Sequence, residues 1–196
     1  MGTRLYHIPW TGDFSDARNR VLDLATGDWI LSVDADERLR FVSRSEIEQS
    51  LNDPANIAYH VSLHPKTGWT GMWVLRLFRN DPEIRFRGIF HETPWKGLEK
   101  VLSRDAKELG FSCLVLDHLG YDDADNQREK LMRNRFLLLK EIEINPANAY
   151  DSLATCHFKI GNYTEAQKYF EQAEKSGPNP MEYKVKRQLC EAMMSP

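Results

Sequence analysis

The sequence has few cysteines and no excess of charge of either sign. Its three cysteines, Cys113, Cys156 and Cys190, are widely spaced. An odd number of cysteines without a Cys-x-x-Cys pair argues against a disulfide framework and against a structural zinc site. Lys and Arg number 26 against 29 Asp and Glu, whereas a nucleic-acid-binding domain usually shows a basic excess. We therefore expect a reduced protein without a nucleic-acid partner.

Long apolar runs and a secretion signal are also missing. The longest apolar stretches, Trp29–Val33 and Cys113–Leu116, are far shorter than the roughly 20 residues that cross a bilayer. The N-terminus lacks the basic-then-apolar pattern of a signal peptide. The glycine-rich phosphate motifs G-x-x-x-x-G-K-[ST] and G-x-G-x-x-G are absent as well. These features predict a cytoplasmic protein, with peripheral attachment at the inner membrane left open.

The chain changes character around residues 119–126. Before that point, helical patterns are expected at Asp16–Leu24 and from Ser43 or Ser45 to about Leu51. Short β-rich runs lie between and after them, at Trp29–Val33, Ala58–Leu63, Trp73–Phe78 and Leu114–Leu116. Helices that alternate with strands in this way predict an α/β domain with a central sheet over residues 1–121.

Residues 122–196 have a helical pattern throughout. A first helix, ending before Asn145-Pro146, is expected to carry an apolar stripe of Leu131, Phe136, Leu138, Leu139 and Ile142. Residues 145–178 then resemble a tetratricopeptide repeat (TPR), in which small residues let two antiparallel helices approach closely. The residues that match are Leu153, Ala154, His157, Ala166, Phe170, Ala173 and Pro178.

Gly161-Asn162 supplies the turn of this repeat, and residues 181–194 form a further helix. Since about three repeats are needed for independent stability, a single repeat has to pack against the first domain. A structural role and a protein-docking role for these helices both stay open.

An acidic sequence follows the first predicted strand. On an extended chain, Asp34 and Asp36 point to the same side, at the carboxyl end of that strand. Paired carboxylates suit a hard cation such as Mn²⁺ or Mg²⁺, and open α/β sheets bind ligands at this end. A plain acidic turn is the other interpretation of the same residues.

Six segments in order resemble the bacterial family 2 glycosyltransferases that carry C-terminal TPRs. They are Trp10–Asn19, Ala25–Leu31, Asp34–Glu37, Arg76–Arg79, Phe86–Glu92 and Asp117–Tyr121. The resemblance implies a GT-A fold followed by a small all-α segment. It also implies inverting transfer of a sugar from a nucleotide-diphosphate sugar, linked to UDP or GDP, to an acceptor that the sequence does not identify.

The resemblance also assigns roles to residues. Asp34 and Asp36 correspond to the Asp-x-Asp element, which holds Mn²⁺ or Mg²⁺ on the donor diphosphate, and His118 to a late histidine that completes the metal shell. Glu92 corresponds to the base that activates the acceptor, beside His91 as a substrate-binding residue. Arg18 corresponds to a residue that faces the diphosphate.

Each of these roles has a structural alternative. Glu92 can form an ion pair with Arg87, His118 can be a hydrogen-bonded structural residue, and Arg18 can be an exposed helix residue. Aromatic side chains at Trp69, Trp73 and Trp95 suit stacking on a sugar, although such residues are more often part of the core.

The sequence departs from the family at its start. Only nine residues precede Trp10, where the family has a strand–helix–strand unit that binds the base and ribose. We therefore expect a GT-A-like domain that is incomplete at its N-terminus, in a fragment, a chain with a misplaced start or a shortened form without catalysis. The rival hypothesis is a non-catalytic TPR interaction module on a degenerate glycosyltransferase scaffold. A metal-dependent hydrolase is a third.

Overall fold

The computed structural model describes residues 3–40, 43–66, 71–119 and 124–195, which form two compact units. The α/β unit comprises Arg18–Phe86 and Pro94–Tyr121, and the helical unit comprises Met1–Ala17, Arg87–Thr93 and Asp122–Pro196. The sequence predicted one unit from residue 1 to 121, whereas the structure groups residues 1–17 and 87–93 with the helices. The predicted boundary at residues 121–122 and Trp69 lie outside the described residues.

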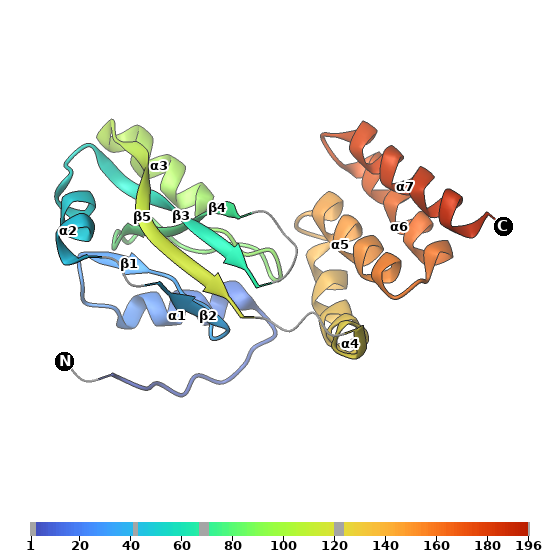
Figure 1. Ribbon diagram of the computed structural model, residues 1–196, viewed down its shortest axis with the longest axis horizontal. Helices are drawn as coiled ribbons and strands as arrows, with labels where there is room; N and C mark the ends of the chain where they lie inside the picture. Colours follow the sequence, from blue (N-terminus) through green and yellow to red (C-terminus); the bar gives the residue numbers. More distant parts are fainter. Residues whose placement is uncertain (1–2, 41–42, 67–70, 120–123, 196) are drawn as a thin grey trace. The chain divides into compact units, whose positions relative to one another are not determined.

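The α/β unit contains a five-stranded sheet with the order β1-β4-β3-β5-β2 among the described residues (Figure 1). Its strands are β1 (Trp29–Leu31), β2 (Glu37–Leu39), β3 (Asn56–Pro65), β4 (Met72–Arg79) and β5 (Glu108–His118). Strands β3 and β5 are parallel, and the other neighbouring pairs are antiparallel. Four strands match predicted runs. The fifth, β2, follows the acidic residues and was not predicted.

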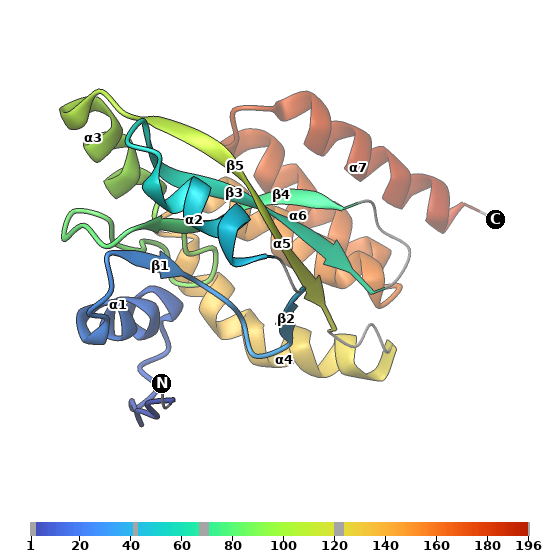
Figure 2. The same cartoon turned by 60° about the vertical axis from the view of Figure 1, so that its left-hand side comes forward.

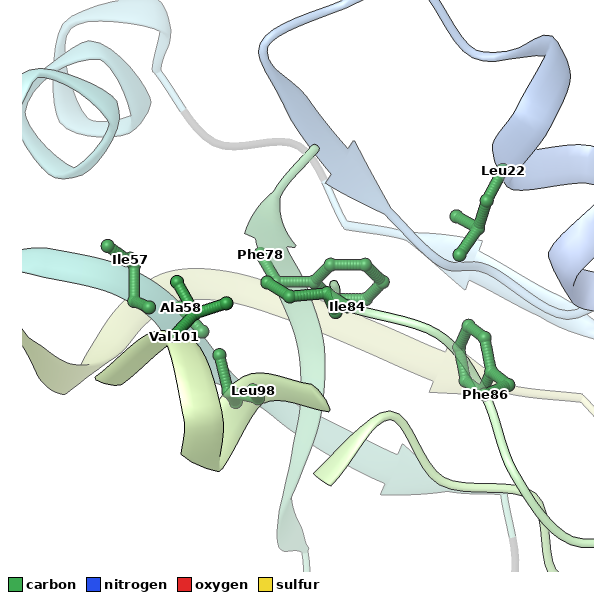
Figure 3. Close-up of a cluster of buried hydrophobic side chains, with 8 residues drawn as sticks. All are labelled: Leu22, Ile57, Ala58, Phe78, Ile84, Phe86, Leu98 and Val101. Atoms are coloured by element: carbon green, nitrogen blue, oxygen red, sulfur yellow. The ribbon is translucent and has the colours of Figure 1, made fainter. Parts of the chain in front are cut away.

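One face of the sheet packs against α1 (Phe14–Leu24) and α3 (Trp95–Asp105). Figure 3 shows Leu22 of α1 and Leu98 and Val101 of α3 in one buried cluster with Ala58 and Phe78 of the sheet. Helix α3 approaches the preceding loop closely at Gly97, where an added Cβ would lie 2.1 Å from the Glu83 carbonyl oxygen. Glycine at this position therefore permits the packing.

A second cluster contains α2 (Arg44–Asn52) and other strand residues. Ser43 caps α2 and forms a capping box with Glu46, as its predicted start implied. Ile47 and Leu51 of α2 pack against a cluster that includes Tyr59, Val61, Leu77, Leu114 and Leu116. Helix α2 therefore contributes to a core that is separate from the α1–α3 cluster.

The core interpretation of the tryptophans is wrong for the two that the structure describes. Trp73 is 53% exposed and Trp95 is 43% exposed. Trp73 packs edge-on against Phe111, with ring centroids 4.9 Å apart, and Phe111 is itself 65% exposed. The two rings therefore form a surface cluster on β4 and β5.

The helical unit contains α4 (Ala124–Glu141), α5 (Pro146–Lys159), α6 (Tyr163–Ser176) and α7 (Pro180–Met194). The helices follow one another side by side in chain order (Figure 2). As the repeat pattern predicts, Ala154, Ala166, Phe170 and Ala173 are buried between the helices. Gly161 takes the positive φ of 78° that the α5–α6 turn requires.

The buried face of α4 differs from the predicted stripe. Leu137 and Leu138 are buried, whereas Phe136 and Leu139 are exposed. Glu141 lies three residues after Leu138 and four after Leu137, so that helical periodicity places all three on one face. Glu141 is itself buried. The face that packs therefore includes a carboxylate, which an apolar pattern does not reveal.

Candidate functional site

The acidic residues after β1 form a tight turn. The Glu37 backbone N–H donates to the Asp34 carbonyl oxygen at 3.0 Å, and the Asp34 N–H donates to the Glu37 carboxylate at 2.8 Å. The prediction that Asp34 and Asp36 lie on an extended chain is therefore wrong, because the chain turns at Ala35 and Asp36. As a result, the two carboxylates have different partners.

Asp34 lies between two guanidinium groups. Arg18 of α1 donates to Asp34 Oδ1 and Arg76 of β4 donates to Oδ2, both at 2.8 Å. Arg18 also donates to Ser32, and its guanidinium lies 5.3 Å from the centre of the Phe86 ring. The alternative of an exposed helix arginine therefore does not describe Arg18.

The two arginines determine the charge state of Asp34. Partial burial acts to raise the pKa of this carboxyl, but the charges of Arg76 and Arg18 and their hydrogen bonds outweigh burial, so that the pKa lies below its ordinary value of 3.8. Asp34 is accordingly ionised at neutral pH, and the turn holds a fixed negative charge between two fixed positive charges.

Glu37 is a site residue to which sequence reasoning gave no role. Its side chain is almost completely buried and accepts from Arg76 at 2.7 Å. Arg76 therefore joins Glu37 to Asp34. A signal for this existed, because Arg76 lies between Leu75 and Leu77 in an apolar strand, and a charged residue in such a strand requires a partner.

Asp36 and His118 are brought together on the other side of the turn. His118 Nε2 lies 3.2 Å from Asp36 Oδ2, while the Leu119 N–H donates to the Asp36 carbonyl oxygen. Two of the three predicted metal ligands are therefore neighbours. Asp34, the third, is held by arginines, and among the residues that the structure describes no three His, Cys, Asp or Glu side chains form a metal-binding group.

His91 and Glu92 belong to the helical unit, in the loop Arg87–Thr93. The ends of this loop are joined by backbone hydrogen bonds between Arg87 and Thr93, and His91 Nε2 bonds to the hydroxyl of Ser152 on α5. Surrounding protein disfavours the charged imidazole and lowers the pKa of His91 below 6.5, although the carboxylates of Glu141 and Glu92 act in the opposite direction.

Glu92 is half-buried beside His91, and its catalytic role stays a prediction. The loop that carries it has a further partner, Glu141 of α4, which accepts from the backbone N–H groups of Ile89 and Phe90. Glu141 was not predicted as a site residue, because the periodicity of apolar residues gives no signal for a buried carboxylate.

Comparison with known proteins identifies relatives of two kinds, and no family model matches the chain. A TPR repeat-containing protein of Synechococcus elongatus is 33% identical over 187 residues, which is 91% of this chain and 46% of that protein. The prophage-derived glycosyltransferase SunS of Bacillus subtilis is 26% identical over 147 residues, 71% of this chain and 33% of SunS. The SunS of Bacillus phage SPbeta matches equally.

The chain thus spans less than half the length of the curated relatives it matches. No helix among the described residues has the length and apolar character to cross a membrane. The chain is a mixed α/β and helical protein that is homologous, at a distance, to a glycosyltransferase, and it shares more identity with a TPR repeat-containing protein.

Proposed function

We propose that this chain is part of an inverting glycosyltransferase of the GT-A, family 2 type, which uses a UDP- or GDP-linked sugar. The observation that carries the proposal is the charged group at the turn after β1, where Asp34, Arg18 and Arg76 form one ion network and Asp36 contacts His118. Similarity to SunS over 71% of the chain supports the same class of reaction.

The arginines suit the donor diphosphate. A guanidinium group offers paired N–H donors in a geometry that matches phosphate oxygens, and its charge does not depend on pH near neutrality. Asp34 orients Arg18 and Arg76 before a ligand arrives. Their proposed task is to bind the diphosphate of the nucleotide-sugar.

A divalent cation fits this turn in part. Asp36 and His118 supply an oxygen and a nitrogen that Mn²⁺ accepts, whereas Asp34 is engaged by Arg18 and Arg76. Mn²⁺ or Mg²⁺ would therefore be held first by Asp36 and His118, with Asp34 as the third predicted ligand. Such an ion offsets negative charge on the departing diphosphate.

Glu92 is the proposed base. Its carboxylate would take the proton of the acceptor hydroxyl, while the acceptor oxygen forms a bond to the anomeric carbon of the sugar. The bond from that carbon to the diphosphate breaks, and the diphosphate leaves with the electron pair. Attack from the face opposite the leaving group inverts the anomeric centre.

Calorimetric titration of the chain with UDP and with GDP, each with and without Mn²⁺, tests the proposal. We expect binding that Mn²⁺ strengthens and that Asp36→Asn weakens. Asp36 is exposed and outside the arginine network, so that its loss leaves the fold intact. Asp34→Ala is expected to weaken binding as well, because Arg18 and Arg76 lose the carboxylate that orients them, and Asp28→Asn, an exposed aspartate before β1, is the matched control. Absence of nucleotide binding to the folded chain would refute the proposal.

The alternative is a TPR-type interaction module on a glycosyltransferase scaffold without catalysis. The higher identity to a TPR repeat-containing protein favours it. In that case the same titrations show no nucleotide binding, and Asp34→Ala and Asp36→Asn leave the binding of a protein partner through α5–α7 unchanged.

A further inference from the structure

A buried carboxylate in the helical unit has no role in the function proposed above. Glu141, at the end of α4, is 1% exposed. Its Oε2 atom accepts the backbone N–H of Ile89 and, at 3.2 Å, that of Phe90. We propose that Glu141 is a positioning residue, which holds the loop Arg87–Thr93 so that His91 and Glu92 are presented in one fixed arrangement. The catalytic part of this inference depends on the proposed function.

The loop is shaped so that it requires this support. Gly88 has a φ of 105°, and an added Cβ there would lie 2.8 Å from the His91 carbonyl oxygen. The backbone is thus folded back on itself immediately before the two functional residues. A segment of this kind cannot satisfy its N–H groups by regular pairing, and Ile89 and Phe90 donate to the Glu141 side chain instead.

Two further contacts fix the same segment. The Ser15 hydroxyl donates to the Gly88 carbonyl oxygen, and the Phe14 N–H donates to the Ile89 carbonyl oxygen at 3.0 Å. His91 is bonded in turn to Ser152 of α5. Residues of three helices, α1, α4 and α5, therefore form hydrogen bonds with the loop.

The choice of a carboxylate is informative. The other buried residues on this face of α4, Leu137 and Leu138, are apolar. A leucine at position 141 would fit the same face and would avoid the free-energy cost of burying a charge. A carboxylate at this position gives charge-assisted hydrogen bonds to two consecutive peptide groups. This fixes the orientation of the peptides that precede His91 and Glu92, which apolar packing does not do.

Hydrogen exchange in the full chain tests the positioning directly, without an activity. In Glu141→Leu, exchange of the Ile89 and Phe90 amides should accelerate by about 10-fold or more, as expected for the loss of hydrogen bonds to a charged group. Glu141→Gln keeps the shape and one acceptor, and should give a smaller acceleration. Glu143→Gln, an exposed glutamate just beyond α4, is the matched control and should exchange like the wild type.

The catalytic consequence is measured with UDP-glucose as the donor probe and water as the acceptor. Glu141→Gln should lower kcat with little change in KM, because the base is misplaced while donor contacts remain. Unchanged exchange at Ile89 and Phe90 in both Glu141 variants would overturn the inference. Accelerated exchange together with a wild type that neither binds UDP nor hydrolyses the donor would support the loop positioning and refute the proposed function.

Discussion

Replacement of Arg76 by methionine is expected to destabilise the α/β unit strongly. The Arg76 side chain is 17% exposed, and that of Glu37 is 1% exposed. Methionine retains most of the apolar length of arginine but leaves the Glu37 carboxylate buried without its cation. Removal of one partner of a buried ion pair costs about 3–5 kcal/mol, which is a large share of the roughly 5–15 kcal/mol that stabilises an ordinary domain.

Arg40→Met is the matched control, since Arg40 pairs with Asp117 at the surface and is 51% exposed. Exposed pairs contribute about 0–1 kcal/mol. Urea unfolding at neutral pH, with the midpoint and the m-value both recorded, gives the two free energies of unfolding. Equal losses for Arg76→Met and Arg40→Met would contradict the assignment of Arg76 to a buried network.

A double-mutant cycle separates the ion pair from other effects. Glu37→Gln removes the buried charge, and Arg76→Met then leaves no carboxylate without a partner at that position. The double variant should therefore lose less stability than the sum of the two single variants. Additive losses would mean that Arg76 acts through Asp34 or through packing, and not through Glu37.

Three further predictions concern acid stability and packing. Because the folded-state pKa of Asp34 lies below its unfolded value of 3.8, its contribution is complete above about pH 4 and is lost as the pH falls through the folded pKa. In Asp34→Asn, the free energy of unfolding measured with urea should therefore fall less steeply between about pH 5 and pH 3 than it does in the wild type. Gly97→Ala should lower the free energy of unfolding by about 1–3 kcal/mol through the contact with Glu83. Thermal melting should show this loss for Gly97→Ala and none for the control Lys96→Ala. Ala154→Leu, at a buried helix contact, should cost about 1–3 kcal/mol, and Ala192→Leu, at an exposed position, less than 1.

Local patterns were sufficient for most elements of the fold. Apolar runs predicted four strands, Ser43 with Glu46 predicted the start of α2, and small residues such as Ala154 and Ala166 predicted the helix pair. Helix α3 was missed although Leu98 and Val101 lie at helical spacing, because Gly97 disfavours a helix locally. Its close approach to Glu83 provides the compensation, and that contact is not visible in sequence.

Strand β2 was missed for a different reason. Its sequence, Glu37-Arg38-Leu39, lacks the β-branched and aromatic residues that predict strands. It is a strand because it pairs with β5, about 80 residues further along the chain. Pairing over that separation depends on the whole sheet, so no local pattern reveals it.

The sequence predicted the acidic residues of the candidate site but not the residues that surround them. Asp34 and Asp36 stand out because they follow an apolar strand, but the residue that organises them, Arg76, is 42 positions from Asp34. The extended geometry was wrong because Glu37 accepts the Asp34 N–H and closes a turn. A carboxylate between two arginines has a different proton affinity from one in an open acidic turn.

The division of the chain bears on the choice between the two functional hypotheses. The segments that resemble a glycosyltransferase are distributed over both units, since Asp34–Glu37 lies in the α/β unit while His91 and Glu92 lie in the helical unit. The repeat helices are therefore part of the same folded body as the proposed base. A cut at residue 121 would remove the Glu141 carboxylate that accepts the N–H groups of Ile89 and Phe90, and would therefore disturb the loop that carries the proposed base. Loss of activity after such a cut would not distinguish an interaction module from an enzyme, and for this reason substitutions at Glu141 and Asp36 in the full chain are the sharper tests.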